Sequence, residues 1–404
     1  MINLETPKKF APLVSQAHQV ATEVFRPISR HYDLAEHEYP KELDMLAALI
    51  DGMNEGSDIG GAGAAGVRRD TSSGSDAANR NGSNMSTVLG IMELCWGDVG
   101  LLLSMPRQGL GNSAIASVAN PEQLERFEGR WAAMAITEPE AGSDSAAIRT
   151  TAVRDGDDYV LNGEKIYVTS GERAELVVVW ATLDRSQGRG AIKSFVVERS
   201  NPGLKLERLE HKLGIRASDT AAFRLEDCRV PAEDMLGNPD IEAKQGFGGA
   251  MQTFDNTRPL VAGMAVGLTR ACLEEAREQI ERAGVRIDYE RPALSQHAAA
   301  ARYLEMEADY EAARLLTLQA AWMADNSKPN SLQASMAKAK AGRSCVEVAL
   351  GCVELCGSLG YSEGSLLEKW ARDAKILDIF EGTQQIQLLI VARLLLGKTS
   401  AELK

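Results

Sequence analysis

The sequence predicts a multidomain protein of the α+β class, with helices in the first and last parts of the chain and strands between them. Apolar residues recur at helical spacing over much of residues 1–130 and 237–404, which indicates amphipathic helices. Residues 131–236 contain short runs rich in Val, Leu and Ile between turn residues, a pattern typical of strands. Because strands and helices do not alternate, we expect three segregated domains rather than a sheet of βαβ units.

The N-terminal domain, residues 1–130, is expected to be helical. Helical spacing over residues 10–51 predicts two helices separated at Pro40, and it returns over about residues 85–104 and 110–128. Such spacing places the apolar side chains of each segment on one face, which can then pack on a shared core.

Between these helical patterns, residues 52–84 are rich in Gly, Ser, Asn and charged residues, which predicts a long surface loop. The loop contains Gly61-x-Gly63-x-x-Gly66, the string found in dinucleotide-binding βαβ units. That fingerprint needs a strand before it and a helix after it, so that a pyrophosphate meets a helix N-terminus. Neither pattern flanks the string, so it does not by itself predict a dinucleotide site.

The middle domain, residues 131–236, is expected to be a small β domain. In YVLNGEKIYVT, two strand-like runs flank Asn162-Gly163, the dipeptide most typical of a two-residue hairpin turn. Further strands are predicted in AELVVVWATLD, SFVVERS, LKLERLE and TAAFRLEDCRV.

The C-terminal domain, residues 237–404, is expected to be helical throughout. Helical spacing predicts helices over residues 261–283, 295–326, 331–356 and 375–396. In the third of these helices, Ser331 is the expected N-cap and Gly357 the expected stop.

Composition excludes several classes of function. The net charge of -13, without a basic cluster, disfavours nucleic-acid binding. No run of eighteen apolar residues predicts a membrane span, and the N-terminus resembles neither a secretory signal nor a transit peptide, so a cytoplasmic protein is expected. Six dispersed cysteines predict no disulfide framework, and the five histidines show no metal-ligand spacing, so no metal is expected. Cys352 and Cys356, four residues apart, could form a metal or redox pair, but free cysteines more often act as small buried hydrophobes.

Five polar motifs stand in order along the chain: ITEPEAGSD at 136–144, NGEKIYVTSG at 162–171, LGIRASDTAAFRLEDCRVP at 213–231, FDNTRP at 254–259 and ARDAKILDIFEGTQQIQ at 371–387. The first alone could be a polar turn at a domain boundary. Together, over about residues 85–396, they resemble the flavin-dependent acyl-CoA dehydrogenases. The resemblance implies an N-terminal helical domain, a middle β-barrel and a C-terminal four-helix bundle, with FAD between barrel and bundle.

The resemblance also assigns roles to residues of these motifs. FAD contacts are implied for Ile136, Thr137, Ser143, Tyr167, Val168, Thr169, Arg286, Tyr289, Gly357, Thr383 and Gln385. Contacts with the acyl-CoA are implied for Ser143, Asp255, Arg258 and Gly382. The first 84 residues lack a recognisable family segment, so no role is assigned there.

Glu381 is the expected catalytic residue. Oxidation between the α and β carbons of a thioester needs a base for a proton and an acceptor for a hydride, and no side chain accepts a hydride. A solvated Glu with a pKa of ~4.3 is a feeble base, but burial beside Phe380 and an acyl chain would raise its pKa toward ~6 to 7. By the resemblance, the backbone N–H of Glu381 and a flavin hydroxyl would stabilise the enolate-like oxygen.

Two alternatives for Glu381 are open. It could be a helix-capping acid, or an acid paired with Arg372 or Lys375. Some relatives place the base on an earlier helix, at the position that matches Thr257, but threonine cannot serve as that base.

The sequence departs from the family pattern in the motifs that reach the FAD of a neighbouring subunit. Relatives have Arg-x-x-Phe-Gly and Gln-x-x-Gly-Gly, whereas this chain has Arg286-Ile-Asp-Tyr-Glu290 and Glu354-Leu-Cys-Gly-Ser358. Two added carboxylates near a pyrophosphate would weaken FAD binding, unless these positions face solvent. The sharper hypothesis is a hetero-oligomer in which a paralogous chain completes the cofactor site.

The expected function is that of an acyl-CoA dehydrogenase of fatty-acid β-oxidation, which makes trans-2-enoyl-CoA and passes electrons to an electron-transfer flavoprotein. A homotetramer or a hetero-oligomer is expected. Two rivals are an acyl-CoA oxidase, in which oxygen reaches the reduced ring, and a non-catalytic subunit that completes the FAD site of a partner. The intact Phe380-Glu381-Gly382-Thr383 run argues against the second rival.

Overall fold

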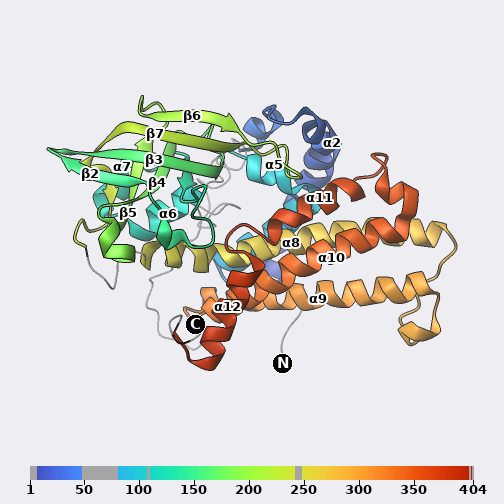
Figure 1. Cartoon of the computed structure of the whole chain (residues 1–404). Coiled ribbons are helices and arrows are strands. Elements are labelled where there is room, and N and C mark those ends of the chain that lie inside the picture. The colour runs from blue at the N-terminus through green and yellow to red at the C-terminus, as the bar shows by residue number, and fades with distance from the viewer. Residues whose placement is uncertain (1–6, 48–80, 107–109, 242–247, 400–401, 403–404) are drawn as a thin grey trace.

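A computed structural model describes residues 7–47, 81–106, 110–241, 248–399 and 402 of the chain (Figure 1). Residues 61–66, with the Gly-x-Gly-x-x-Gly string, and most of the expected loop at 52–84 lie outside the described residues. The described residues form a helical N-terminal unit, a β unit and a helical C-terminal unit, in the order the sequence predicts.

The N-terminal unit contains the predicted helices. Its helices are α1 Ala11–Val20, a π-helical turn Ala21–Phe25, α2 Arg26–Ala35, a short helix over residues 42–47, α4 Ser83–Gly97, α5 Val99–Ser104, α6 Leu110–Val118 and α7 Pro121–Arg126. The helix predicted over residues 85–104 is broken at Asp98, whose side chain accepts a hydrogen bond of 2.8 Å from the Leu101 N–H and caps α5.

The β unit is one mixed sheet. Its strands are β1 Ala132–Ala135, β2 Thr151–Asp155, β3 Asp158–Thr169, β4 Leu176–Thr182, β5 Ile192–Glu198, β6 Leu204–Leu209, β7 Thr220–Pro231 and β8 Met235–Leu236. The strand order is β6-β7-β3-β2-β4-β5-β8, and β1 pairs with β4 in parallel. Because β6 and β8 end this path, the sheet is open, and the expected closed barrel is not confirmed.

The hairpin predicted at Asn162-Gly163 is wrong, because both residues lie inside the continuous strand β3. The pairing of β3 with β7 shifts register there, which marks a β-bulge. The Asp227 N–H donates to the Asn162 Oδ1 at 2.8 Å, so the asparagine side chain bonds the bulge of the neighbouring strand. A Cβ at Gly163 would lie 2.7 Å from the Thr150 Cα, so close strand packing requires the glycine.

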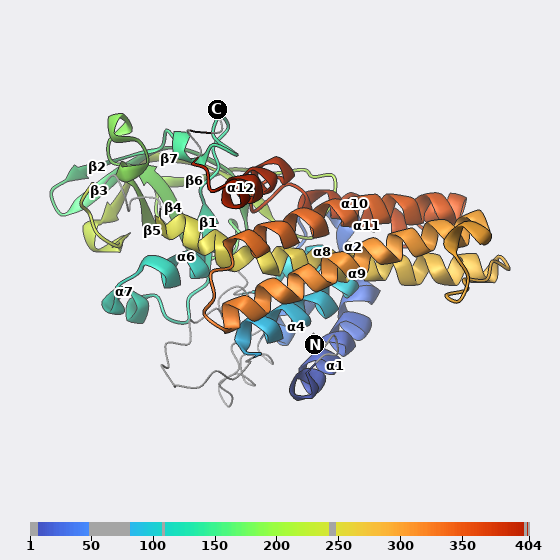
Figure 2. The same cartoon turned by 90° about the horizontal axis from the view of Figure 1, so that it is seen from below.

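The C-terminal unit consists of α8 Gly248–Arg282, α9 Ala298–Asp325, α10 Ser331–Tyr361, α11 Leu367–Leu377 and α12 Gln384–Leu396. Figure 2 shows α8, α9 and α10 side by side, with α12 at the end of the unit nearest the sheet. A helical C-terminal unit agrees with the prediction, whereas its description as a four-helix bundle stays a prediction.

Two helix boundaries in this unit differ from the predicted ones. Asn330, not Ser331, is the N-cap of α10, and the helix runs past Gly357 to Tyr361 with a break in its helical dihedrals at Gly357. The single helix predicted over residues 375–396 is instead two helices, interrupted over residues 378–383. Apolar spacing continues through the interruption, so periodicity alone could not detect it.

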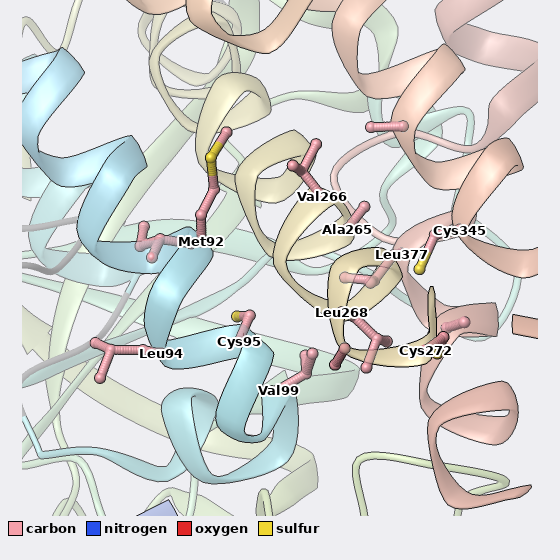
Figure 3. Packing of buried hydrophobic residues seen from close by; sticks show 14 of the residues in the cluster. Met92, Leu94, Cys95, Val99, Ala265, Val266, Leu268, Cys272, Cys345 and Leu377 are labelled. Atoms are coloured by element: carbon pink, nitrogen blue, oxygen red, sulfur yellow. The ribbon is translucent and has the colours of Figure 1, made fainter. Parts of the chain in front are cut away.

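The N-terminal and C-terminal units share one hydrophobic core. Figure 3 shows Met92, Cys95 and Val99 packed toward Val266 and Leu268 of α8. A Cβ at Gly267 would lie 2.2 Å from the Met92 carbonyl oxygen, so the close contact of α4 and α8 depends on that glycine. The shared core holds α8 against the N-terminal unit. Thr257, a residue of the site described below, lies on this helix.

One described helix, α10, is long and apolar enough to cross a membrane by length and composition. It packs against α8, α9, α11 and α12 in this structure, as a core helix does. The expected absence of a membrane span stays a prediction.

Candidate active site

Glu381 lies in the loop that separates α11 from α12. Its backbone has a φ of +56°, in the left-handed region, and the next residue, Gly382, has a φ of +92°. A non-glycine residue in such a conformation costs about 1–3 kcal/mol and persists only where its surroundings hold it. A Cβ at Gly382 would lie 2.4 Å from the Gln387 Nε2, so the position requires glycine.

Several hydrogen bonds hold this loop in place. The Phe380 N–H donates to the Ile376 carbonyl at 3.0 Å, and the Gln387 Nε2 donates to the Glu381 carbonyl at 2.9 Å. The Thr383 hydroxyl accepts from the Ile386 N–H at 3.4 Å and caps α12. Thr383, rather than Glu381, is therefore the capping residue, and the helix-capping alternative for Glu381 is wrong.

The Glu381 carboxylate is half-buried and faces α8. Its Oε2 accepts a hydrogen bond of 2.7 Å from the Thr257 hydroxyl. Burial raises the pKa of Glu381, and the Thr257 hydrogen bond, Arg258 and Lys338 oppose that rise without cancelling it. The result is an acid whose pKa is shifted toward the range in which carboxylates act as bases at neutral pH.

The alternative pairing of Glu381 with Arg372 or Lys375 is also wrong. Arg372 bonds to Asp33 at 2.6 Å and Glu368 at 2.9 Å, while Lys375 pairs with Asp378 at 3.0 Å. These carboxylates neutralise the two cations and leave Glu381 to face Thr257.

Lys338 is a site residue that the sequence analysis missed. It comes from α10, is 1% exposed, and donates from its Nζ to the Gly382 carbonyl at 2.6 Å. Burial lowers its pKa to about 8, against the attraction of Asp378 and Glu381. Lys338 therefore bonds the left-handed loop and places a positive charge near Glu381. The sequence of this region predicts only a helix, and no motif marks Lys338 as a residue of the site.

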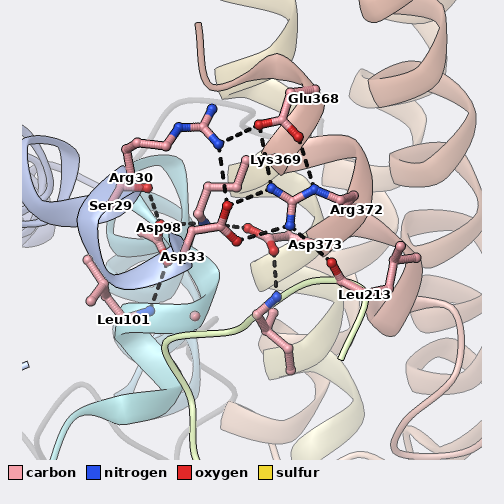
Figure 4. Close-up of polar contacts among 12 residues, drawn as sticks. Ser29, Arg30, Asp33, Asp98, Leu101, Leu213, Glu368, Lys369, Arg372 and Asp373 are labelled. Carbon is pink, nitrogen blue, oxygen red and sulfur yellow. Dashed lines mark hydrogen bonds and ion pairs between the residues drawn. The ribbon is translucent and has the colours of Figure 1, made fainter. Parts of the chain in front are cut away.

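The helix before Glu381, α11, is fixed by a buried ion network (Figure 4). Lys369, itself 1% exposed, bonds to Asp98 and to Asp373, each at 2.6 Å. Burial alone would lower the pKa of Lys369, but Asp373 and Asp98 raise it above its usual value, so the ammonium stays charged. Asp98 comes from the N-terminal unit, so this network joins α11 to that unit.

The β unit is attached to the same helix. The Ile215 N–H donates to the Asp373 Oδ1 at 2.5 Å, and the Arg372 Nη1 donates to the Leu213 carbonyl at 3.0 Å. A Cβ at Gly214 would lie 2.5 Å from the Arg372 carbonyl carbon, which explains the glycine between them. All three units therefore meet at α11, directly before the loop that carries Glu381.

The β unit brings the first two motifs together. The buried Lys165 donates to the Ile136 carbonyl at 3.1 Å and to Glu138 at 2.7 Å, and the Ile166 N–H donates to the Thr137 carbonyl at 2.9 Å. Ile136 and Thr137 thus lie beside Lys165 and Ile166 of β3, directly before residues 167–169.

The side chains in this part of the β unit fit a flavin. The Tyr167 ring is 62% exposed on a backbone with a φ of +58°, and Val168 is buried beneath it. Among the described residues, the hydroxyls of Thr137, Ser143 and Thr169 have no hydrogen-bond partner. An exposed aromatic ring suits contact with a planar ring system, and hydroxyls without a partner can bond to its polar edge.

The expected cofactor residues of the C-terminal unit fall into two groups. Thr383 and the exposed Gln385 lie at α12, near the sheet, whereas Arg286 and Tyr289 lie between α8 and α9 at the other end of the unit (Figure 1). Gly357 is exposed, as are Glu290 and Glu354, the two acids that depart from the family pattern. Within one chain, therefore, Arg286 and Tyr289 lie far from Thr383 and Gln385.

The remaining expected residues have simple outcomes. Arg258 is buried on α8 and favours the ionised form of Glu381, whereas the side chain of Asp255 lies outside the described residues.

Burial raises the pKa of Cys356 to about 11 and raises that of Cys352 further, so both thiols are protonated at neutral pH. The small-hydrophobe interpretation of this pair suits these thiols better than a metal or redox role.

The overall fold is that of the acyl-CoA dehydrogenases. The structure of butyryl-CoA dehydrogenase from Megasphaera elsdenii matches with a TM-score of 0.82 and 30% identity, over 98% of this chain and 100% of that chain. Sequence models of the acyl-CoA dehydrogenase middle domain and C-terminal domain match residues 133–228 and 244–396. The chain belongs to the acyl-CoA dehydrogenase family.

Two curated relatives agree. The acyl-CoA dehydrogenase of Bacillus subtilis is 34% identical over 307 residues, which are 74% of this chain and 79% of that protein. The mitochondrial short-chain specific acyl-CoA dehydrogenase of Rattus norvegicus is 39% identical over 258 residues. That match spans 64% of this chain and 61% of the rat protein.

Replacing Lys369 by methionine tests the network that fixes α11. Removing one member of a buried ion pair leaves uncompensated charge and typically costs about 3–5 kcal/mol. We expect Lys369→Met to lower the free energy of unfolding by about that amount, measured by denaturant titration. Lys205→Met, which removes the partner of Glu226 from an ion pair exposed on both sides, is the control and should change stability by less than about 1 kcal/mol. Equal effects would contradict the assigned role.

Proposed function

We propose that this protein is an FAD-dependent acyl-CoA dehydrogenase that uses Glu381 to remove the α-proton of an acyl-CoA thioester and yields trans-2-enoyl-CoA. The observation that carries the proposal is a half-buried carboxylate with a raised pKa, in a left-handed loop that three parts of the chain hold in place. A carboxylate that only stabilised the fold would need no such conformation.

FAD supplies the hydride acceptor that the side chains lack. Ile136, Thr137 and Thr169, with the exposed Tyr167 ring, are the residues proposed to hold its ring system. Thr383 and Gln385 are proposed to contact the cofactor from the bundle side, and Ser143, Asp255, Arg258 and Gly382 to contact the acyl-CoA.

The loop offers a second chemical function. Among the described residues, the backbone N–H groups of Glu381 and Gly382 donate no hydrogen bond. A free N–H beside the base can donate to the thioester oxygen as negative charge develops on it, and one such donor is typically worth about 10²- to 10³-fold in rate. Lys338 positions this donor because it bonds the Gly382 carbonyl, one residue away.

The reduced flavin is proposed to pass its electrons to an electron-transfer flavoprotein, in the cytoplasm, as part of fatty-acid β-oxidation. An oligomer is also proposed, either a homotetramer or a hetero-oligomer with a paralogous chain. Leucines 388, 389, 394, 395 and 396 of α12 are each 49–67% exposed, and exposed apolar side chains gathered on one helix favour association. A second subunit would bring Arg286, Tyr289 and Gly357 to a cofactor site that one chain leaves incomplete.

One measurement separates these assemblies. If the chain purified alone binds one FAD tightly per subunit, a paralogous partner is not required and the hetero-oligomer is ruled out. If FAD is lost on gel filtration, a non-catalytic or partner-dependent subunit is favoured.

A separate measurement tests the electron acceptor. Hydrogen peroxide release in air, without an added acceptor, would indicate an acyl-CoA oxidase instead of a dehydrogenase.

Glu381→Gln is the direct test of the base. The variant should keep bound FAD but reduce it at least about 10²-fold more slowly during anaerobic titration with a panel of acyl-CoAs, because the general base is lost. In the wild type, the rate of flavin bleaching should rise with pH through the raised pKa of Glu381, because only the ionised carboxylate accepts a proton. The exposed Glu363→Gln is the control. Near-normal bleaching by Glu381→Gln would refute the assignment.

Lys338→Met tests the positioning residue. Loss of its positive charge should raise the pKa of Glu381 further, so the pH profile of flavin reduction should move to higher pH. Loss of its hydrogen bond should also cost about 1–3 kcal/mol of stability, because the Gly382 carbonyl loses a buried donor. Lys340→Met, on the same helix but paired with Asp309 at 2.5 Å, is the control. An unshifted profile in Lys338→Met would show a purely structural role.

A further inference from the structure

A second group of polar side chains lies where the N-terminal unit meets the β unit, apart from Glu381. Glu36 and His37 directly follow α2, and His211 lies in the connection between β6 and β7. The His211 Nδ1 lies 2.9 Å from the Glu36 Oε2, and the rings of His37 and His211 meet edge to face with centroids 4.9 Å apart. One ligand atom from each residue can be chosen so that all three lie within 4.8 Å of one another.

His37 has an unusual environment. Both of its ring nitrogens are buried, and neither has a hydrogen-bond partner among the described residues. Native structures rarely leave a buried polar group unpaired, so such a group points to a missing ion, water or ligand. The nitrogens lie in the same cluster as a carboxylate and a second imidazole, two other groups that bind metals.

The backbone of the cluster is strained. Glu36 has a φ of +26° and His37 a φ of +71°, two consecutive non-glycine residues with positive φ. Such strain costs about 1–3 kcal/mol for each residue and occurs preferentially at functional sites and ligand clamps. The Glu36 Oε1 also accepts from the Lys212 N–H at 3.1 Å, which holds the carboxylate toward the β unit.

The separations suit a transition-metal ion after a small adjustment. Bonds of about 2.1 Å in a tetrahedral site place ligand atoms about 3.4 Å apart. The shortest observed separation is 2.9 Å and none exceeds 4.8 Å, so side-chain movements on the order of 1 Å would suffice. Two imidazoles and one carboxylate favour Zn²⁺ over Mg²⁺ or Ca²⁺, which prefer oxygen ligands only.

The cationic side chains of Lys212 and Arg216, next to the cluster in sequence, form their hydrogen bonds elsewhere. The Lys212 Nζ donates to the Ser218 carbonyl at 2.8 Å, and Arg216 donates to the Lys212 carbonyl at 3.0 Å. Both cations therefore have partners within the connection between β6 and β7. Glu36 supplies the negative charge that a divalent ion requires.

We propose that Glu36, His37 and His211 bind one Zn²⁺ ion, with water as the fourth ligand, and that this ion fastens the end of α2 to the connection between β6 and β7. The same connection supplies Leu213 and Ile215 to the ion network at α11. The ion would fix this segment from its other side. Its role is structural, because none of its three ligands forms a hydrogen bond or ion pair with Glu381 or the proposed flavin surface.

Equilibrium dialysis of the untagged, full-length chain against Zn²⁺ tests this site, with bound metal measured by atomic emission, which flavin does not disturb. The wild type should hold one ion per chain more than His37→Gly or His211→Gln. Each variant should bind that ion at least about 10-fold more weakly, since even loss of an outer-shell partner typically costs that much. Glycine suits the left-handed backbone at position 37, so that variant should fold.

His31→Gln is the matched control, because His31 faces Glu38 across 3.9 Å on the exposed end of α2. This control should bind Zn²⁺ as the wild type does, and Zn²⁺ should raise the melting temperature of both by the same amount. The proposal is overturned if wild type, His37→Gly and His211→Gln take up equal Zn²⁺, or if Zn²⁺ raises the melting temperature of all equally. The readout is independent of acyl-CoA oxidation, so it stands apart from the proposed function.

Discussion

The buried ammonium of Lys369 between Asp98 and Asp373 is the interaction on which the candidate site depends. Through these two carboxylates, α11 is bonded to α5 and to the segment around Ile215 of the β unit. Glu381 follows α11 by only a few residues and has a backbone conformation that an unrestrained chain would avoid. A buried ion network costs desolvation energy, but it can specify one arrangement of its partners, and the proposed role of Glu381 as a base requires such a fixed position.

Charge around Glu381 is set by two opposed effects. Burial disfavours the carboxylate anion, while Arg258, Lys338 and the Thr257 hydroxyl favour it. The net effect is a pKa above the usual value for a Glu side chain, which suits the proposed role of this carboxylate as a base.

Sequence periodicity predicted most elements correctly but failed where a side chain or backbone contact overrides a local preference. Asn162-Gly163 forms a β-bulge because Asp227 and Thr150 pack against it, contacts that come from distant parts of the chain. The helix predicted through Glu381 is interrupted because Gly382, Lys338 and Gln387 hold a loop there. The predicted hairpin and the predicted continuous helix were therefore wrong for the same reason. A local sequence pattern does not specify which residues from distant parts of the chain will contact it.

The sequence by itself determined the order of helical and strand units and the family resemblance, because these depend on residue type and spacing. It also singled out Glu381 as the candidate base, which stays a prediction. Only the tertiary structure decided that Thr257 faces Glu381, that Lys338 bonds its loop, and that His37 meets His211 from 174 positions away in the chain. The pKa of a side chain depends on its burial and on the charged and polar groups that contact it. Those contacts follow from the packing of whole units, which residue spacing along the chain does not specify.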